Sequence, residues 1–227
     1  MQDIYYEVNG SGEAIFLLHG NQENHKIFNQ LVEDLKDEYK VIAVDSRYHG
    51  KSIKSGELSL NQFAQDVKDV ADELALETYS VIGFSDGANI ALTLANKDNR
   101  MTSAVLMAPN SQPSGIKTFY YFQMWLTLIC LLPFCIYNPR ARRIFALTRF
   151  MLKEPHFTSE ELNNIKIPVL LLSGDHDMIK ASDIDWISQQ LPEATNVIIK
   201  NSSHFMLGDQ YEKVLKEIRR FYDVITK

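Results

Sequence analysis

Short apolar runs alternate with helical patterns along the whole chain. Across 27–35, 60–74 and 211–225, apolar residues recur every three or four positions, which predicts helices that bury one face. The runs between them are apolar at most positions, as parallel strands buried on both faces are. This alternation predicts an α/β fold, a mostly parallel central β-sheet with helices on both faces. The predicted strands are 4–8, 14–18, 41–45, 80–84, 103–108, 169–173 and 196–200.

One segment interrupts the alternation, between the strands predicted at 103–108 and 169–173. It is too long for a simple connection, so we expect a single domain, 1–227, with a helical lid or cap inserted at about 111–164. Residues 119–137 carry no charge and reach the length of a membrane span. A crossing helix would place strands of one sheet on opposite sides of a membrane. We therefore favour a lid helix folded over a pocket, with membrane contact as the alternative.

Composition and charge indicate which class of protein, partner and compartment to expect. The 227 residues are 45% hydrophobic and 23% charged, as in ordinary globular proteins. A formal net charge of −6 argues against a nucleic acid partner, because phosphate backbones are bound by clustered Lys and Arg. The N-terminus, MQDIYYEVNG, shows no basic and then apolar run that would mark a secretory signal. The cytoplasm is the expected compartment.

Charge is unevenly distributed between the lid and the rest of the chain. Residues 111–153 hold six basic residues and no acidic one, a charge of +6 against −12 for the remainder. The lid could attract an anionic substrate group or an anionic membrane surface. Equally, its basic face could pair with acidic residues of the main domain, and the sequence leaves both interpretations open. The basic residues are Lys117, Arg140, Arg142, Arg143, Arg149 and Lys153.

A nucleophile pattern lies between a predicted strand and a predicted helix. The sequence GFSDG at 83–87 places Ser85 on a sharp strand-to-helix turn, where a strained backbone exposes the hydroxyl. The helix expected at 88–96 directs its N–H groups and positive dipole end at a reacting carbonyl. Ser85 is therefore the predicted nucleophile.

Five motifs in order extend this pattern: HGN at 19–21, DSRYHGKS at 45–52, GFSDG at 83–87, SGDHD at 173–177 and SSHF at 202–205. Together they resemble the α/β-hydrolase family over nearly the whole chain, with the lid outside the motifs. The resemblance implies the α/β-hydrolase fold and a Ser-His-Asp triad in the order serine, acid, histidine. Tyr48 departs from the family pattern, which usually has glycine there.

The resemblance selects the remaining catalytic candidates. His204 follows the last predicted strand and precedes the final helix, where the family carries its general base. In the family, the acid is an aspartate that follows a glycine after two intervening residues. This pattern selects Asp177 as the acid and leaves Asp175 to cap the loop. Backbone N–H groups of Asn21 and Asp86 are the expected oxyanion-hole donors.

The other polar residues of these loops are expected to be structural or solvated. His19 should hold its loop through hydrogen bonds to backbone, and Asp45 should satisfy backbone donors in the loop that it opens. No pattern in the sequence indicates a metal site, a nucleotide or another cofactor, so none is expected. The histidines expected to be solvated, two of them near the site mouth, are His25, His49, His156 and His176.

These features predict a serine hydrolase that cleaves an ester or related acyl bond of a small, partly apolar substrate through an acyl-enzyme. A carboxylic ester hydrolase is the favoured class. Carbon–carbon bond hydrolases and acyltransferases share this template and stay as alternatives. Some relatives keep the triad but act as ligand receptors, which is the alternative outside enzymology. The sequence does not determine the oligomeric state.

Overall fold

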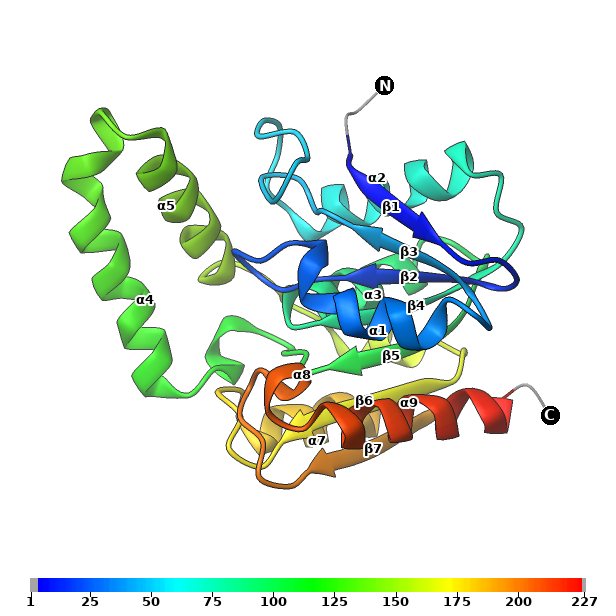
Figure 1. The fold of residues 1–227 in the computed structure, drawn as a ribbon. Coiled ribbons are helices and arrows are strands. Elements are labelled where there is room, and N and C mark those ends of the chain that lie inside the picture. Colours follow the sequence, from blue (N-terminus) through cyan, green and yellow to red (C-terminus); the bar gives the residue numbers. More distant parts are fainter. Residues whose placement is uncertain (1–3, 226–227) are drawn as a thin grey trace.

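The computed structural model describes residues 4–225, and its strands form one seven-stranded sheet in the order β1-β3-β2-β4-β5-β6-β7 (Figure 1). Only β1 is antiparallel to its neighbour, β3, and every other pair is parallel. The predicted fold class is confirmed. The strands are β1 (Tyr6–Asn9), β2 (Ala14–Leu18), β3 (Lys40–Val44), β4 (Tyr79–Phe84), β5 (Met101–Met107), β6 (Val169–Gly174) and β7 (Ala194–Ile199).

The central strands are buried on both faces because helices cover the sheet on both sides. All residues of β2, β4 and β6 are buried, as the continuous apolar runs predicted. One face packs α2 (Leu60–Glu73) and α3 (Asp86–Ala95), and the other packs α1 (Asn29–Leu35) and α9 (Tyr211–Ile225). The remaining short elements of the main domain are η1 (His25–Phe28), α7 (Ala181–Gln190) and α8 (Met206–Asp209).

The strand order reverses direction beside β2. From β2 the chain first moves to β3 on one side and then crosses to β4 on the other side. At such a reversal, the loops that leave the carboxyl ends of the two strands diverge and open a crevice. The loop after β2 and the turn after β4 therefore flank one site.

Residues between β5 and β6 form a helical insertion, which we call the insertion (residues 111–164). Its two long helices, α4 and α5, lie side by side and stand away from the sheet (Figure 1). Of the fourteen residues of α4, only Met124 and Leu128 are buried, so most of the apolar stretch faces solvent. The elements are η2 (Pro113–Gly115), α4 (Thr118–Leu131), η3 (Leu132–Ile136), α5 (Pro139–Met151) and α6 (Ser159–Asn163).

Helices α4 and η3 together form one apolar helical segment, Thr118–Ile136. By length and composition alone, its 19 residues could cross a membrane. The strands on either side of the insertion, β5 and β6, are neighbours in the same sheet. A crossing by α4 would therefore need α5 to return through the bilayer, but four of the thirteen α5 residues are arginines.

Candidate active site

Ser85 occupies the turn between β4 and α3 in a backbone conformation that few residues adopt. Its φ is 54° and its ψ is −117°, and its carbonyl accepts hydrogen bonds from the first turn of α3. The flanking glycines make this turn sterically possible. A Cβ on Gly87 would lie 1.9 Å from the Leu18 carbonyl oxygen, and one on Gly83 would lie 2.4 Å from the Gly87 oxygen. The turn thus packs directly on the end of β2.

Ser85, His204 and Asp177 meet at the carboxyl ends of the strands, although they lie far apart in the sequence. Nε2 of His204 is 3.0 Å from Ser85 Oγ, and its Nδ1 is 2.7 Å from Asp177 Oδ1. Because the carboxylate only accepts, Nδ1 carries the proton and Nε2 is left to accept from the serine. The three residues predicted from the motifs therefore form one hydrogen-bonded chain.

The loop after β6 separates its two aspartates. Asp177 is 3% exposed and also accepts a hydrogen bond from the backbone N–H of Ile179 at 2.9 Å. Asp175 instead accepts from the backbone N–H of Ser202. This bond and one from the Asn201 backbone hold the pKa of Asp175 below the usual range. Asp175 therefore caps the loop, as predicted, and only Asp177 reaches His204.

Asn21 and Asp86, the predicted oxyanion-hole residues, are joined through their side chains. Nδ2 of Asn21 donates to Asp86 Oδ2 at 2.9 Å, which ties the loop after β2 to the first residue of α3. Burial raises the pKa of Asp86 to about 6 despite this hydrogen bond. The side-chain link was not foreseen, because nothing in the sequence pairs residues that lie 65 positions apart.

A cavity of about 400 Å³ opens beside Ser85 and His204. Its walls are largely apolar, with Phe84, Tyr120 from α4 and Met151 from α5 among them. Of the apolar stretch, only Tyr120 reaches this lining, so the stretch borders the cavity through a single side chain. Such a space suits a small, partly apolar group.

Glu23 is the functional candidate that sequence reasoning missed. It lies in the lining of this cavity, and its Oε2 accepts a hydrogen bond from the Gly20 N–H at 3.0 Å. Burial raises the pKa of Glu23 to about 6, and the nearby Asp86 adds to this effect. The only available signal was its position four residues after His19.

Within residues 4–225, no group of three His, Cys, Asp or Glu side chains is arranged to hold a metal ion.

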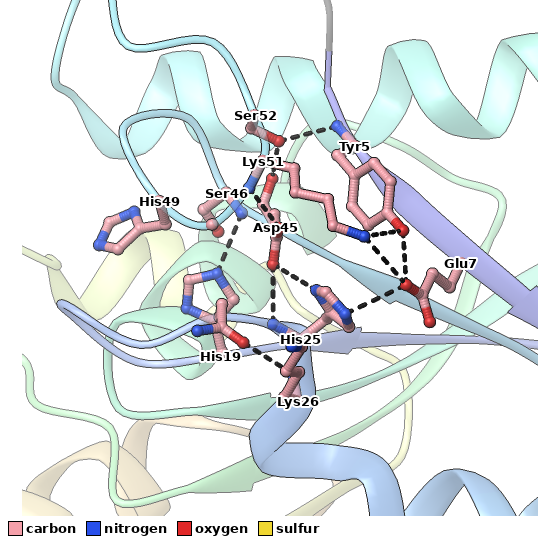
Figure 2. A network of polar contacts seen from close by, with 12 residues as sticks. Tyr5, Glu7, His19, His25, Lys26, Asp45, Ser46, His49, Lys51 and Ser52 are labelled. Carbon is pink, nitrogen blue, oxygen red and sulfur yellow. Dashed lines mark hydrogen bonds and ion pairs between the residues drawn. The ribbon is translucent and has the colours of Figure 1, made fainter.

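A buried polar network holds the loops that flank the site (Figure 2). At its centre, Asp45 accepts hydrogen bonds from the backbone N–H groups of His25 and Lys51, at 2.8 and 2.7 Å. Burial by itself would raise the pKa of Asp45, but these bonds hold it below the usual value. Ser52 accepts from the Tyr5 N–H and donates to the Asp45 carbonyl. Asp45 is therefore structural, as predicted.

His19 and His49 connect this network to the loop that carries Asn21. His19 Nδ1 faces the Gly20 carbonyl at 2.7 Å and Nε2 accepts from the Ser46 N–H, which confirms its loop-holding role. His49 Nε2 accepts from the Gln22 N–H at 3.0 Å. Burial lowers the pKa of His19 to about 4 and that of His49 to about 3. Both rings are neutral near pH 7, as an accepting nitrogen requires.

Two of the histidines expected to be solvated are buried instead. His49 is 5% exposed, and His25 is 4% exposed with its ring between Asp45 and Glu7. The prediction failed because each ring has a hydrogen-bond partner from a distant segment, Asp45 for His25 and the Gln22 N–H for His49. His156 and His176 are exposed, as predicted.

Tyr48 keeps its loop in a conformation usually reserved for glycine. Its φ is 65°, in the left-handed region that favours glycine, and its hydroxyl donates to the Gly56 carbonyl at 2.9 Å. The departure from the family motif therefore changes the side chain while the backbone keeps the left-handed turn.

Comparison with known proteins agrees with this architecture. A model of the alpha/beta hydrolase fold family matches residues 13–128. The pimeloyl-[acyl-carrier protein] methyl ester esterase of Nitrosomonas europaea is 27% identical, aligned over 90% of this chain and 93% of that protein. Carboxylesterase YbfK of Bacillus subtilis is 24% identical over 92% of this chain and 79% of its own.

Solved structures show the same fold at low sequence identity. A thermophilic esterase from Thermogutta terrifontis superposes with a TM-score of 0.80 at 19% identity, covering 99% of this chain and 94% of that one. The family model matches more than half of the chain. The chain therefore belongs to the alpha/beta hydrolase fold family, as its motifs indicated.

Proposed function

We propose that this protein is a carboxylic ester hydrolase in which Ser85 is the nucleophile, His204 the general base and Asp177 the residue that orients it. The observation that carries the proposal is the continuous hydrogen-bonded chain from Ser85 Oγ through His204 to the buried Asp177. The similar proteins named above, an esterase and a carboxylesterase, support the same reaction class.

In the proposed reaction, His204 Nε2 takes the proton of Ser85 as Oγ attacks the ester carbonyl carbon. The tetrahedral intermediate collapses when the carbon–oxygen bond breaks, and His204 gives its proton to the departing alcohol. Water then attacks the acyl-enzyme with His204 again as base, which releases the acid and restores Ser85. Asp177 stabilises the imidazolium form in both steps.

Backbone N–H groups of Asp86 and Asn21 are proposed to hold the oxyanion. The Asp86 N–H lies at the positive end of α3, where orphan donors and the helix dipole favour negative charge. The hydrogen bond between the two side chains ties together the two segments that carry these donors. A preformed pair of donors needs little rearrangement as charge develops.

The cavity lining favours a short, uncharged acyl group. Its walls are mainly apolar, and Glu23 brings negative charge into the site above about pH 6. We assign the insertion as a cap on the single domain, because Tyr120 and Met151 supply part of the cavity wall. Carboxylated substrates should bind less well than neutral ones of equal length.

Fluorophosphonate labelling tests the assignment. Wild-type protein should label, and Ser85→Ala should lose both the label and turnover of short p-nitrophenyl esters by about 10³-fold or more. Ser203→Ala is a matched control, because Ser203 lines the same cavity but its hydroxyl donates to Asp209.

The control should keep its label and its turnover. Undiminished labelling of Ser85→Ala would refute the catalytic role of Ser85. Labelling of the wild type with a single slow turnover on every ester would instead favour the receptor alternative.

A further inference from the structure

The outward face of α4 and η3 is apolar, where a surface helix normally presents polar residues. Exposed side chains recur there at intervals of three and four residues, which places them on one side of the helix. Phe122 and Ile129 are 65% and 66% exposed. The face, which we call the apolar stripe, consists of Phe119, Phe122, Trp125, Leu126, Ile129 and Leu132.

The basic side chains of the insertion lack acidic partners. Among residues 4–225, none of the six basic residues of the insertion lies within 4.0 Å of a carboxylate oxygen. The interpretation in which the lid pairs with acids of the main domain therefore lacks support. Lys117 donates to the Asp177 carbonyl and Arg142 to the carbonyls of Cys135 and Ile136, so no charge of the six is neutralised by a carboxylate.

Three of these arginines, together with Lys54, line one cavity of about 630 Å³. It lies between the N-terminal half of α5 and the loop after β3, and no acidic residue lines it. Burial lowers the pKa of Lys54, and the nearby positive charge of Arg143 lowers it further. Arg143 Nε is buried and has no hydrogen-bond partner among the described residues. The cavity is suited to an anionic group. Its cations are Arg140, Arg142 and Arg143, together with Lys54, whose Nζ already donates to the carbonyls of His49, Gly50 and Ser52.

This basic cavity is separate from the active site. Its lining shares no residue with the cavity beside Ser85, whose lining contains neither Lys nor Arg. An anionic part of a small substrate held at Ser85 would not meet these arginines. The charges therefore suit a surface outside the catalytic cavity.

We propose that the insertion docks on an anionic phospholipid membrane surface. The apolar stripe would enter the boundary between head groups and acyl chains, and the basic cavity and neighbouring arginines would bind lipid phosphates. Because β5 and β6 are neighbours in one sheet, α4 lies along the membrane instead of crossing it. Aromatic side chains such as Trp125 are well suited to this boundary.

A second copy of the chain fits the stripe less well. Two stripes packed face to face would bring together two copies of the basic segment 111–153, each of charge +6. A head-to-tail contact would need an apolar partner surface on the main domain. The exposed large apolar residues there are Val8, Ile198, Phe205 and Val224, from four separate elements or loops. A bilayer supplies both the apolar layer and the negative charge.

Docking would bring onto the membrane a helix that supplies one side chain to the catalytic cavity. Tyr120 lies on α4 and lines the cavity beside Ser85. The docking itself does not depend on the proposed ester hydrolysis.

Vesicle flotation tests the proposal. Wild-type protein should float with phosphatidylcholine vesicles that contain about 30% phosphatidylglycerol, bind pure phosphatidylcholine at least about tenfold more weakly, and dissociate in high salt. In a Trp186→Phe background, Trp125 is the single tryptophan, and its emission should shift to the blue on binding.

Two triple variants should each weaken binding by about tenfold or more: Phe122→Ser/Trp125→Ser/Ile129→Ser, and Arg140→Gln/Arg142→Gln/Arg143→Gln. Both should keep wild-type hydrolysis of a short soluble ester, which reports that the main domain is folded. Matched controls outside the insertion are Val8→Ser/Ile198→Ser/Val224→Ser and Lys166→Gln/Lys216→Gln/Arg220→Gln, which should bind as the wild type does.

Three results would overturn the proposal. The first is equal binding to neutral and anionic vesicles, or no binding to either. The second is a lipid-free dimer that the stripe variant dissolves, which would assign the stripe to a second copy. The third is an arginine variant that still binds vesicles but has a higher KM for a soluble carboxylated ester. That result would mean that the arginines bind the substrate.

Discussion

The Asp86 side chain couples the nucleophile turn to the loop after β2 through its hydrogen bond with Asn21. Asp86→Ala removes this bond, and we expect kcat to fall about tenfold with little change in KM, because one hydrogen bond contributes about 1 kcal/mol. Asp86→Asn keeps an acceptor oxygen, so its kcat should stay within about threefold of the wild-type kcat. Steady-state kinetics on one short ester measures both. An equal loss in the two variants would mean that the carboxylate charge matters more than the link.

The raised pKa of Asp86 predicts how the stability of the same variants depends on pH. Its folded-state pKa of about 6 lies above 3.8, the ordinary pKa of an aspartate in an unfolded chain. The folded state therefore binds the proton more tightly, and stability falls as the pH rises from about 4 through 6. Asp86→Asn should raise the free energy of unfolding at pH 8 by up to about 3 kcal/mol and change it little at pH 4, as urea unfolding at the two pH values measures.

At the scale of elements, a buried ion pair joins the loop after β3 to α2. Arg47 donates from Nε and Nη2 to the two oxygens of Asp66, at 2.6 and 2.5 Å, and both side chains are nearly inaccessible. Asp66→Ala leaves a buried cation without its carboxylate, so we expect a loss of about 3–5 kcal/mol of unfolding free energy. Urea unfolding measures this value.

An exposed ion pair is the control for this variant. Lys36 and Glu33 pair on the surface of the chain, so Glu33→Ala should cost less than about 1 kcal/mol. The double variant Arg47→Met/Asp66→Leu should recover much of the loss, because no charge is left unpaired. Similar costs for Asp66→Ala and Glu33→Ala would show that the buried pair contributes no more than a surface pair.

Across the whole molecule, the main domain and the insertion differ in how much apolar surface they bury. Helix α9 has 15 residues and buries five side chains, whereas the 14 residues of α4 bury two. In hydrogen exchange followed by mass spectrometry, peptides from 118–131 should exchange at least about tenfold faster than peptides from α9. Equal protection would mean that α4 unfolds only together with the main domain. Added anionic vesicles should slow exchange in α4 alone.

The sequence by itself determined the features that depend on local pattern. Continuous apolar runs predicted the parallel strands, and the residues around Ser85 predicted the strand-to-helix turn, because steric strain there depends on glycine at 83 and 87. The family motifs also selected His204 and Asp177, which the structure places within hydrogen-bond distance of each other.

Only the tertiary structure decided what depends on partners from distant segments. The burial of His25 and His49, the pairing of Asn21 with Asp86 and the entry of Glu23 into the cavity all arise where separate loops meet. The position of α4 is the largest such case. The sequence of an uncharged helix does not tell whether the helix packs against a core or faces outward. In the structure, α4 packs against α5 and leaves the apolar stripe exposed.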